Sequence, residues 1–125
     1  MADTKRTSTD LLTNLFQDGQ TAGISAQDLR DLIVSLDSSY IAVSATYTIL
    51  TTDSTVDCTS GTFTATLPTA VGLEGKIFNI KNSGAGVITI EGDGTETIDG
   101  SLNASLATQY ESITVQSNNA NWIIL

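Results

Sequence analysis

Carboxylates are the side chains through which this chain could most readily do chemistry, because it has fourteen acidic residues and no histidine. Aspartate and glutamate can ligate calcium or cleave a glycosidic bond as a pair. The densest acidic stretch places Glu91, Asp93, Glu96 and Asp99 among glycines and threonines. Its order does not fit an EF-hand loop, which needs spaced ligands, a central glycine and a terminal glutamate. We interpret it as a solvated acidic turn and predict no metal site and no hydrolase site.

Nucleophiles and phosphate-binding loops are equally sparse. The lack of histidine removes the commonest general base and metal ligand. Cys58 is the only cysteine, and the alternation around it favours a small buried core residue. The segment Gly84-Ala-Gly86 lacks the lysine and the strand-to-helix context of a phosphate loop, so we interpret it as a hairpin turn. We therefore predict that the protein is not an enzyme and uses no cofactor.

Three aromatic residues, Tyr47, Tyr110 and Trp122, are the candidates for a binding role. Such side chains can stack on sugar rings, which would make the protein a carbohydrate-binding module. More often they anchor the core of a small β domain. Both interpretations remain open at the level of the sequence.

The charge balance limits the partners. Five basic residues against fourteen acidic ones give a net charge of -9, and Lys5 and Arg6 stand at the extreme N-terminus. Such a surface repels nucleic acid and anionic membranes. No apolar run approaches the roughly 20 residues that span a bilayer. We expect neither nucleic acid nor membrane as a partner.

Residues 1–40 have the pattern of an N-terminal arm with one or two short helices. Apolar residues follow helical spacing between residues 8 and 19 and again between 26 and 36, where Ser25 is a suitable N-cap. Helices this short need a surface to pack on. They either fold back on the rest of the chain, or they pack against copies of themselves or a host surface. The apolar positions predicted to form this anchor are Leu11, Leu12, Leu15, Phe16, Leu29, Leu32, Ile33 and Leu36.

Residues 45–125 are typical of an all-β domain. Short β-branched runs alternate with turn signals at Asn82–Gly86, Asp93-Gly94, Asp99-Gly100 and Ser117–Asn121. This spacing predicts an antiparallel β-sandwich or jelly-roll-like domain. The predicted strands are 46–50, 55–58, 62–67, 76–81, 87–91, 96–98, 101–106, 111–116 and 121–125.

Alternation along these strands predicts which side chains face inward. Phe78 should face away from Ile77, and Ile123 and Leu125 should face away from Trp122 and Ile124. A strand that is apolar on both faces is buried on both, so we expect the outward residues to pack against another subunit. The predicted core is Tyr47, Ile49, Val56, Cys58, Phe63, Leu67, Ile77, Ile80, Ile88, Ile90, Ile98, Leu102, Leu106, Ile113, Val115, Trp122 and Ile124.

An ordered series of short motifs resembles the small β modules of tailed-bacteriophage virion proteins such as tail fibres, tail spikes, head fibres and capsid decoration proteins. The series covers about residues 46–125, and Ile24–Ser35 is similar to a phrase near the start of phage appendage proteins. Its members are Leu67-Pro-Thr-Ala70, Gly75-Lys-Ile-Phe-Asn-Ile-Lys-Asn82, Val87-Ile-Thr-Ile90, Glu96-Thr-Ile-Asp-Gly100 and Asn121-Trp-Ile-Ile124.

This resemblance implies a structural protein on the surface of a phage particle, usually a homotrimer. The short chain favours a capsid decoration (cement) or head-fibre protein over a host-binding fibre. The N-terminal segment would then grip the major capsid protein or another virion protein, and the β domain would project outward. A tail or baseplate adaptor and a short tail-fibre or spike component are the alternatives in the same class.

Overall fold

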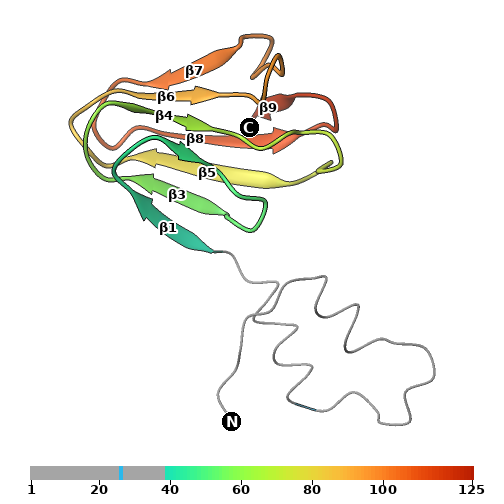
Figure 1. The fold of residues 1–125 in the computed structure, drawn as a ribbon, viewed down its shortest axis with the longest axis horizontal. Coiled ribbons are helices and arrows are strands. Elements are labelled where there is room, and N and C mark those ends of the chain that lie inside the picture. Colours follow the sequence, from blue (N-terminus) through green and yellow to red (C-terminus); the bar gives the residue numbers. More distant parts are fainter. Residues whose placement is uncertain (1–25, 27–38) are drawn as a thin grey trace. The chain divides into compact units, whose positions relative to one another are not determined.

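The computed structural model describes Ala26 and residues 39–125 of the chain. Residues 39–125 form a compact unit of their own, in which nine strands make two sheets (Figure 1). The helices predicted at 8–19 and 26–36 fall, Ala26 apart, outside the described residues. The eight apolar anchor positions, from Leu11 to Leu36, also lie outside them.

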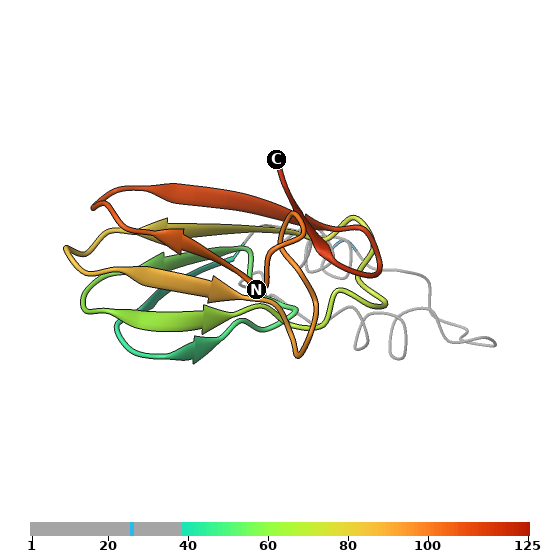
Figure 2. The same ribbon diagram turned by 90° about the horizontal axis from the view of Figure 1, so that it is seen from above.

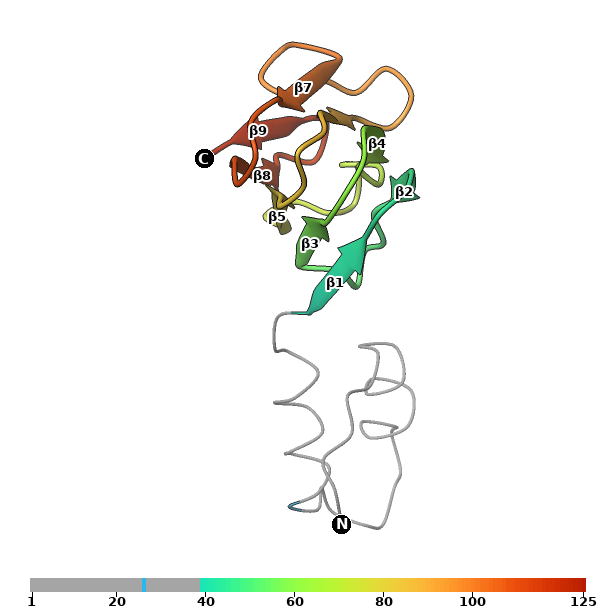
Figure 3. The ribbon, with the colours of Figure 1, turned by 90° about the vertical axis from the view of Figure 1, so that its left-hand side faces the viewer.

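The strands of the two sheets are interleaved along the chain. Sheet A contains, in spatial order, β1 (Tyr40–Val43), β3 (Thr55–Cys58), β5 (Ile77–Asn82), β8 (Ser112–Ser117) and β9 (Trp122–Ile124). Sheet B contains β2 (Tyr47–Thr48), β4 (Phe63–Thr66), β6 (Ile88–Glu91) and β7 (Asn103–Leu106). Figure 3 shows β1, β3, β5, β8 and β9 rising along one side, with β2 and β4 on the other.

The first six strands alternate between the sheets, and each strand from β3 to β6 pairs in parallel with the strand two places earlier. In sheet A this register aligns Ile41 with Val56 and Val56 with Ile80. The antiparallel pairs are β5 with β8, β6 with β7 and β8 with β9. The predicted mainly β, two-sheet architecture is therefore confirmed, but its antiparallel, jelly-roll-like topology is wrong for the first six strands. Figure 2 shows the layers that this winding produces.

Glycines at the corners explain why the topology differs from the prediction. A Cβ on Gly86 would lie 2.1 Å from the Gly61 carbonyl oxygen, and one on Gly84 would lie 2.8 Å from Ser60 Cα. The corner between β5 and β6 thus lies directly against the corner between β3 and β4. These glycines permit close backbone approach, instead of closing a hairpin between adjacent strands.

The strand positions agree better with the sequence than the strand pairing does. Seven predicted strands overlap β3 to β9, and the short β2 lies inside the predicted 46–50. The predicted strand 96–98 is reduced to isolated bridges made by Ile98 with Ser101 and Trp122. The sequence reading also missed β1, so the β region begins at Tyr40, before the expected boundary at residue 45.

The core lies between the sheets and is mostly the predicted one. Its fully buried residues include Val56, Cys58, Ile80, Val115 and Trp122. Tyr47, Phe63 and Ile113 are only partly buried against this cluster. Three predicted core residues are exposed, namely Ile77, Leu102 and Ile124.

Strand periodicity accounts for the exposed residues. In β5, Phe78, Ile80 and Asn82 face inward, so Ile77 must face outward. Leu102 precedes β7 in the loop from β6, and Ile124 ends β9, the last strand of its sheet. Phe78 and Trp122 pack together with their ring centroids 5.5 Å apart, which places an aromatic contact in this small core.

Candidate functional site: the outer face of sheet A

Glu96, in the acidic stretch from Glu91 to Asp99, joins two loops by hydrogen bonds, and we call this arrangement the Glu96 clamp. The Glu96 carboxylate accepts a hydrogen bond from Thr69 Oγ1 at 2.6 Å and one from the Ala70 amide at 2.8 Å. Both donors belong to the loop that follows β4. Instead of the solvated turn predicted from the sequence, this carboxylate joins two loops. Within the described part of the chain, no three acidic or cysteine side chains are grouped as metal ligands.

Cys58 is fully buried, as predicted. Burial, with a smaller contribution from the charge of Asp57, raises the pKa of its thiol to about 11. A thiol held neutral in the core is a poor nucleophile. The described residues include no helix that is long and apolar enough to cross a membrane.

The three predicted aromatic candidates have different surroundings. Trp122 is fully buried, so its indole has no face on which a sugar could stack. Tyr47 is partly buried, and its hydroxyl donates to Asp53 Oδ2 at 2.8 Å. Desolvation and this hydrogen bond raise its pKa to about 12, so Tyr47 acts as a core anchor. Tyr110 is 65% exposed and is the one of the three whose ring faces solvent.

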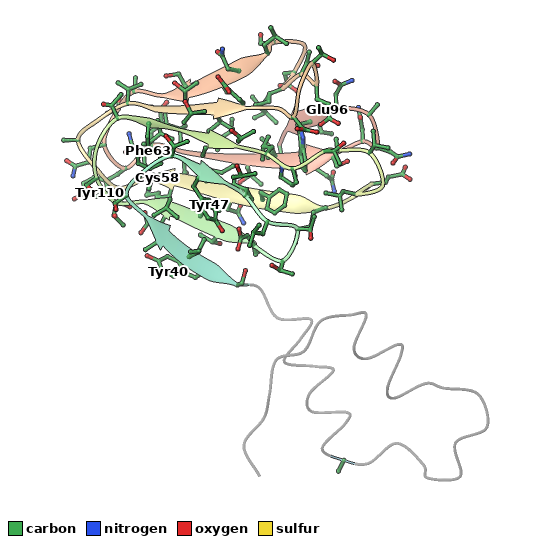
Figure 4. All side chains as sticks on the ribbon, in the orientation of Figure 1. Tyr40, Tyr47, Cys58, Phe63, Glu96 and Tyr110 are labelled. Atoms are coloured by element: carbon green, nitrogen blue, oxygen red, sulfur yellow. The ribbon has the colours of Figure 1, made fainter. Side chains whose placement is uncertain are left out.

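Tyr110 belongs to a group on the outer face of sheet A that we call the tyrosine patch: Tyr40, Asp57, Lys81 and Tyr110. Figure 4 labels its two tyrosines. The parallel register sets Asp57 on β3 beside Lys81 on β5. Both face outward, because Val56, Cys58, Ile80 and Asn82 occupy the inward positions of the same strands. Tyr40 begins β1 at the edge of the sheet and is also 65% exposed.

Hydrogen bonds link the four members of the tyrosine patch in two pairs. The Tyr40 hydroxyl donates to Asp57 Oδ2 at 2.8 Å, while Ser83 Oγ donates to the other carboxylate oxygen. Lys81 Nζ donates to the backbone carbonyl of Tyr110 and lies 5.8 Å from the centroid of its ring. The hydrogen bond to Asp57 raises the pKa of the Tyr40 phenol, which therefore remains a donor at neutral pH.

A second group on the same face is the apolar strip: Ile77, Ile123 and Leu125. Gln116 on β8 pairs with Ile77 on one side and with Ile123 on the other, so the strip crosses β5, β8 and β9. Its members are 38%, 36% and 62% exposed, respectively. Ile123 and Leu125 thus face outward, as predicted. The sequence also predicts Phe78 on this outward face, but Phe78 is fully buried and Ile77 takes the outward position instead.

The sequence reading missed most of the tyrosine patch. Tyr40 ends the predicted N-terminal segment 1–40, and Asp57 and Lys81 fall in the predicted strands 55–58 and 76–81 with no motif that marks them for binding. The alternation of apolar and polar residues in strands 55–58 and 76–81 indicates that Asp57 and Lys81 face the surface. Their adjacency depends on the parallel register between β3 and β5, for which the local sequence carries no signal.

Comparison with known proteins finds no match among protein-family models, curated proteins or solved structures.

Proposed function

We propose that the protein is a structural component of a tailed-phage particle, either a trimeric capsid decoration protein or a head fibre. Its N-terminal segment would bind the major capsid protein or another virion protein, and its β unit would project from the particle. The observation that carries this proposal is a compact β unit with its own core and an apolar strip that is exposed on its surface. Such a unit is suited to display and to contact with copies of itself.

The order of the sequence motifs supports the same proposal. Leu67-Pro-Thr-Ala70 follows β4, and Gly75–Asn82 leads into and forms β5. Val87–Ile90 and Asn121–Ile124 then supply most of β6 and β9. The motifs that resemble phage appendage modules are therefore the framework strands and corners of the unit.

The apolar strip is suited to self-association because it is uncharged. Copies of a chain with a net charge of -9 repel one another over most of their surface. Gln116 and Thr114, which lie among the strip residues on β8, are also uncharged. The outer edge of β9 is already hydrogen-bonded, because the Trp122 amide donates to the Thr97 carbonyl and the Asp99 amide donates to the Trp122 carbonyl. A strand from another copy could not pair with β9 at this point. Contact between copies would therefore use the face of the sheet.

Measuring the mass of the full chain in solution tests the trimer. We expect three times the monomer mass of 13.1 kDa at micromolar concentration. Leu32→Asp, in the predicted anchor, and Ile123→Asp, in the apolar strip, should both lower the association. Val71→Asp is the matched control, because Val71 is 60% exposed in a loop outside the strip. A stable monomer for the unmodified chain would rule out the trimer.

Immunogold labelling of intact particles tests the location. Label over the capsid would support a decoration protein or head fibre, whereas label confined to the tail would favour the adaptor alternative. Particles that carry no label would reject the virion proposal. This outcome does not depend on the oligomeric state, so the two parts of the proposal can fail separately.

A further inference from the structure

We propose that the tyrosine patch binds a neutral oligosaccharide. In this site the rings of Tyr40 and Tyr110 are the stacking surfaces, and Asp57 and Lys81 form hydrogen bonds with sugar hydroxyls. The inference goes beyond the structural role proposed above and does not depend on it. Tyr110 was one of the three aromatic candidates predicted from the sequence. Tyr40, Asp57 and Lys81 were not predicted.

The backbone of Tyr110 is the first reason. Its φ angle is 69°, in the left-handed region that L-residues avoid and that glycine or asparagine adopts readily. A bulky residue in this conformation costs about 1–2 kcal/mol. Its ring is 65% exposed, so little burial offsets that cost. A smaller residue would suit the turn better, which indicates that the tyrosine side chain itself has a role.

The position of Tyr110 is fixed in spite of this exposure. Its amide donates to the Asn82 carbonyl at 2.6 Å, and its own carbonyl accepts the Lys81 ammonium. The adjacent Glu111 amide donates to the Thr108 carbonyl at 3.1 Å, which closes the turn. The backbone that carries the ring is therefore fixed before any ligand arrives, and a preorganised backbone loses less entropy on binding.

Asp57 and Lys81 supply the polar part of the site. Each carboxylate oxygen of Asp57 accepts one hydroxyl, from Tyr40 or Ser83, and keeps a further lone pair. Lys81 has three ammonium donors, and among the described residues it uses one on Tyr110. An acceptor and a donor thus lie side by side on neighbouring strands. Sugar hydroxyls, which both donate and accept, match this arrangement.

The spacing and charge of the patch define the ligand class. Tyr40 lies on β1, and Lys81, which contacts Tyr110, lies on β5, so the patch extends across two strand spacings of sheet A, roughly 10 Å. A site of that width suits a short oligosaccharide better than a single sugar. The net charge of -9 disfavours anionic glycans, so the ligand we infer is neutral.

Saturation-transfer difference NMR on the full chain tests the site. The probes are four neutral trisaccharides, built from glucose, galactose, mannose and N-acetylglucosamine. We expect at least one to receive saturation at millimolar concentration. Tyr40→Ala and Tyr110→Ala should each weaken its binding roughly tenfold. Leu102→Ala is the control, because Leu102 is 61% exposed on the loop between β6 and β7 and should leave binding unchanged.

Tyr110→Asn separates binding from folding. Asparagine tolerates the left-handed conformation, so we expect an unchanged or higher melting temperature together with lost binding. A tyrosine retained only for stability would give the opposite result, a lower melting temperature. The proposal is overturned if none of the four trisaccharides binds, or if Tyr110→Asn binds as the unmodified chain does. Neither result would alter the mass or the labelling that tests the virion role.

Discussion

Gly86 and Gly61 meet so closely at the end of the sandwich that a Cβ on Gly86 would lie 2.1 Å from the Gly61 carbonyl oxygen. Gly61 belongs to the corner between β3 and β4, and Gly86 to the corner between β5 and β6. This contact brings together the points where successive windings of the chain change sheet. We expect the parallel stacking of β3 on β5 and of β4 on β6 to depend on it.

Gly86→Ala should therefore destabilise the protein by more than about 2 kcal/mol, because backbone on both sides must shift to admit the methyl group. Urea denaturation measures the loss. The matched control is Gly94→Asn, at a position with a φ of 58° and no heavy atom within 4 Å of the added Cβ. Asparagine tolerates that conformation, so the control should lose less than about 1 kcal/mol. Equal losses in the two variants would contradict the role of the corner contact.

The Glu96 clamp should contribute to stability through its hydrogen bonds to Thr69 and Ala70. Glu96→Ala should cost about 1–3 kcal/mol, since it leaves the Ala70 amide without its partner. Glu74→Ala makes the same chemical change at an exposed position and should cost less than about 0.5 kcal/mol. Thermal unfolding of both variants measures the difference. A Glu96 variant as stable as the Glu74 variant would show that the loops do not need the clamp.

Cys58 should make the protein less stable at alkaline pH. Its pKa is raised from 9.0 to about 11, mainly by burial. Since the folded pKa lies above the unfolded value, the stability from the neutral thiol is complete below pH 9 and is lost towards pH 11. The slope from this group approaches about 1.4 kcal/mol per pH unit in that window. Tyr47, with a pKa raised to about 12, acts in the same direction at higher pH.

Cys58→Ala provides the comparison for this alkaline effect. Its overall stability will be lower because of the lost packing, so the informative quantity is the slope of unfolding free energy against pH. We expect a shallower slope between pH 9 and pH 11 in the variant, measured by urea denaturation at each pH. Identical slopes would mean that the thiol titrates normally in the folded protein.

Trp122 should report the integrity of the core, since it is the only tryptophan and is fully buried. Its fluorescence should be blue-shifted and shielded from acrylamide in the native protein, and both properties should disappear on unfolding. Trp122→Ala should cost about 3–5 kcal/mol through lost burial and lost contact with Phe78. Efficient quenching in the native state would contradict the burial of this residue.

The strands were largely predictable because alternation is a local signal. Thr55–Cys58 alternates buried with partly exposed residues in the structure, as its sequence indicates. Strand pairing is not a local signal. Val56 pairs with Ile41 on one side and with Ile80 on the other, fifteen and twenty-four residues away in the sequence. Turn-forming residues such as Gly84 favoured a hairpin between adjacent strands. In the structure they serve contact between corners, and composition alone does not separate these two uses of glycine.

The candidate site was less predictable than the fold for the same reason. Tyr110 could be nominated from its residue type, but its left-handed backbone and solvent exposure arise from the turn around it. Tyr40 follows a polar stretch that resembles a linker, and it becomes part of a strand only through pairing with β3. A site assembled across a sheet is defined by register, which the sequence of each strand does not specify.

The positions of β1 and β9 have a practical consequence for protein engineering. They are the two outer strands of sheet A, so the chain enters the β unit at one edge and reaches Leu125 at the other. Four strand spacings separate these edges, which is about 19 Å. A peptide or fluorescent protein fused after Leu125 would therefore emerge from the edge opposite to the one where the chain enters. Such a fusion would leave β1, with Tyr40 at its start, unobstructed.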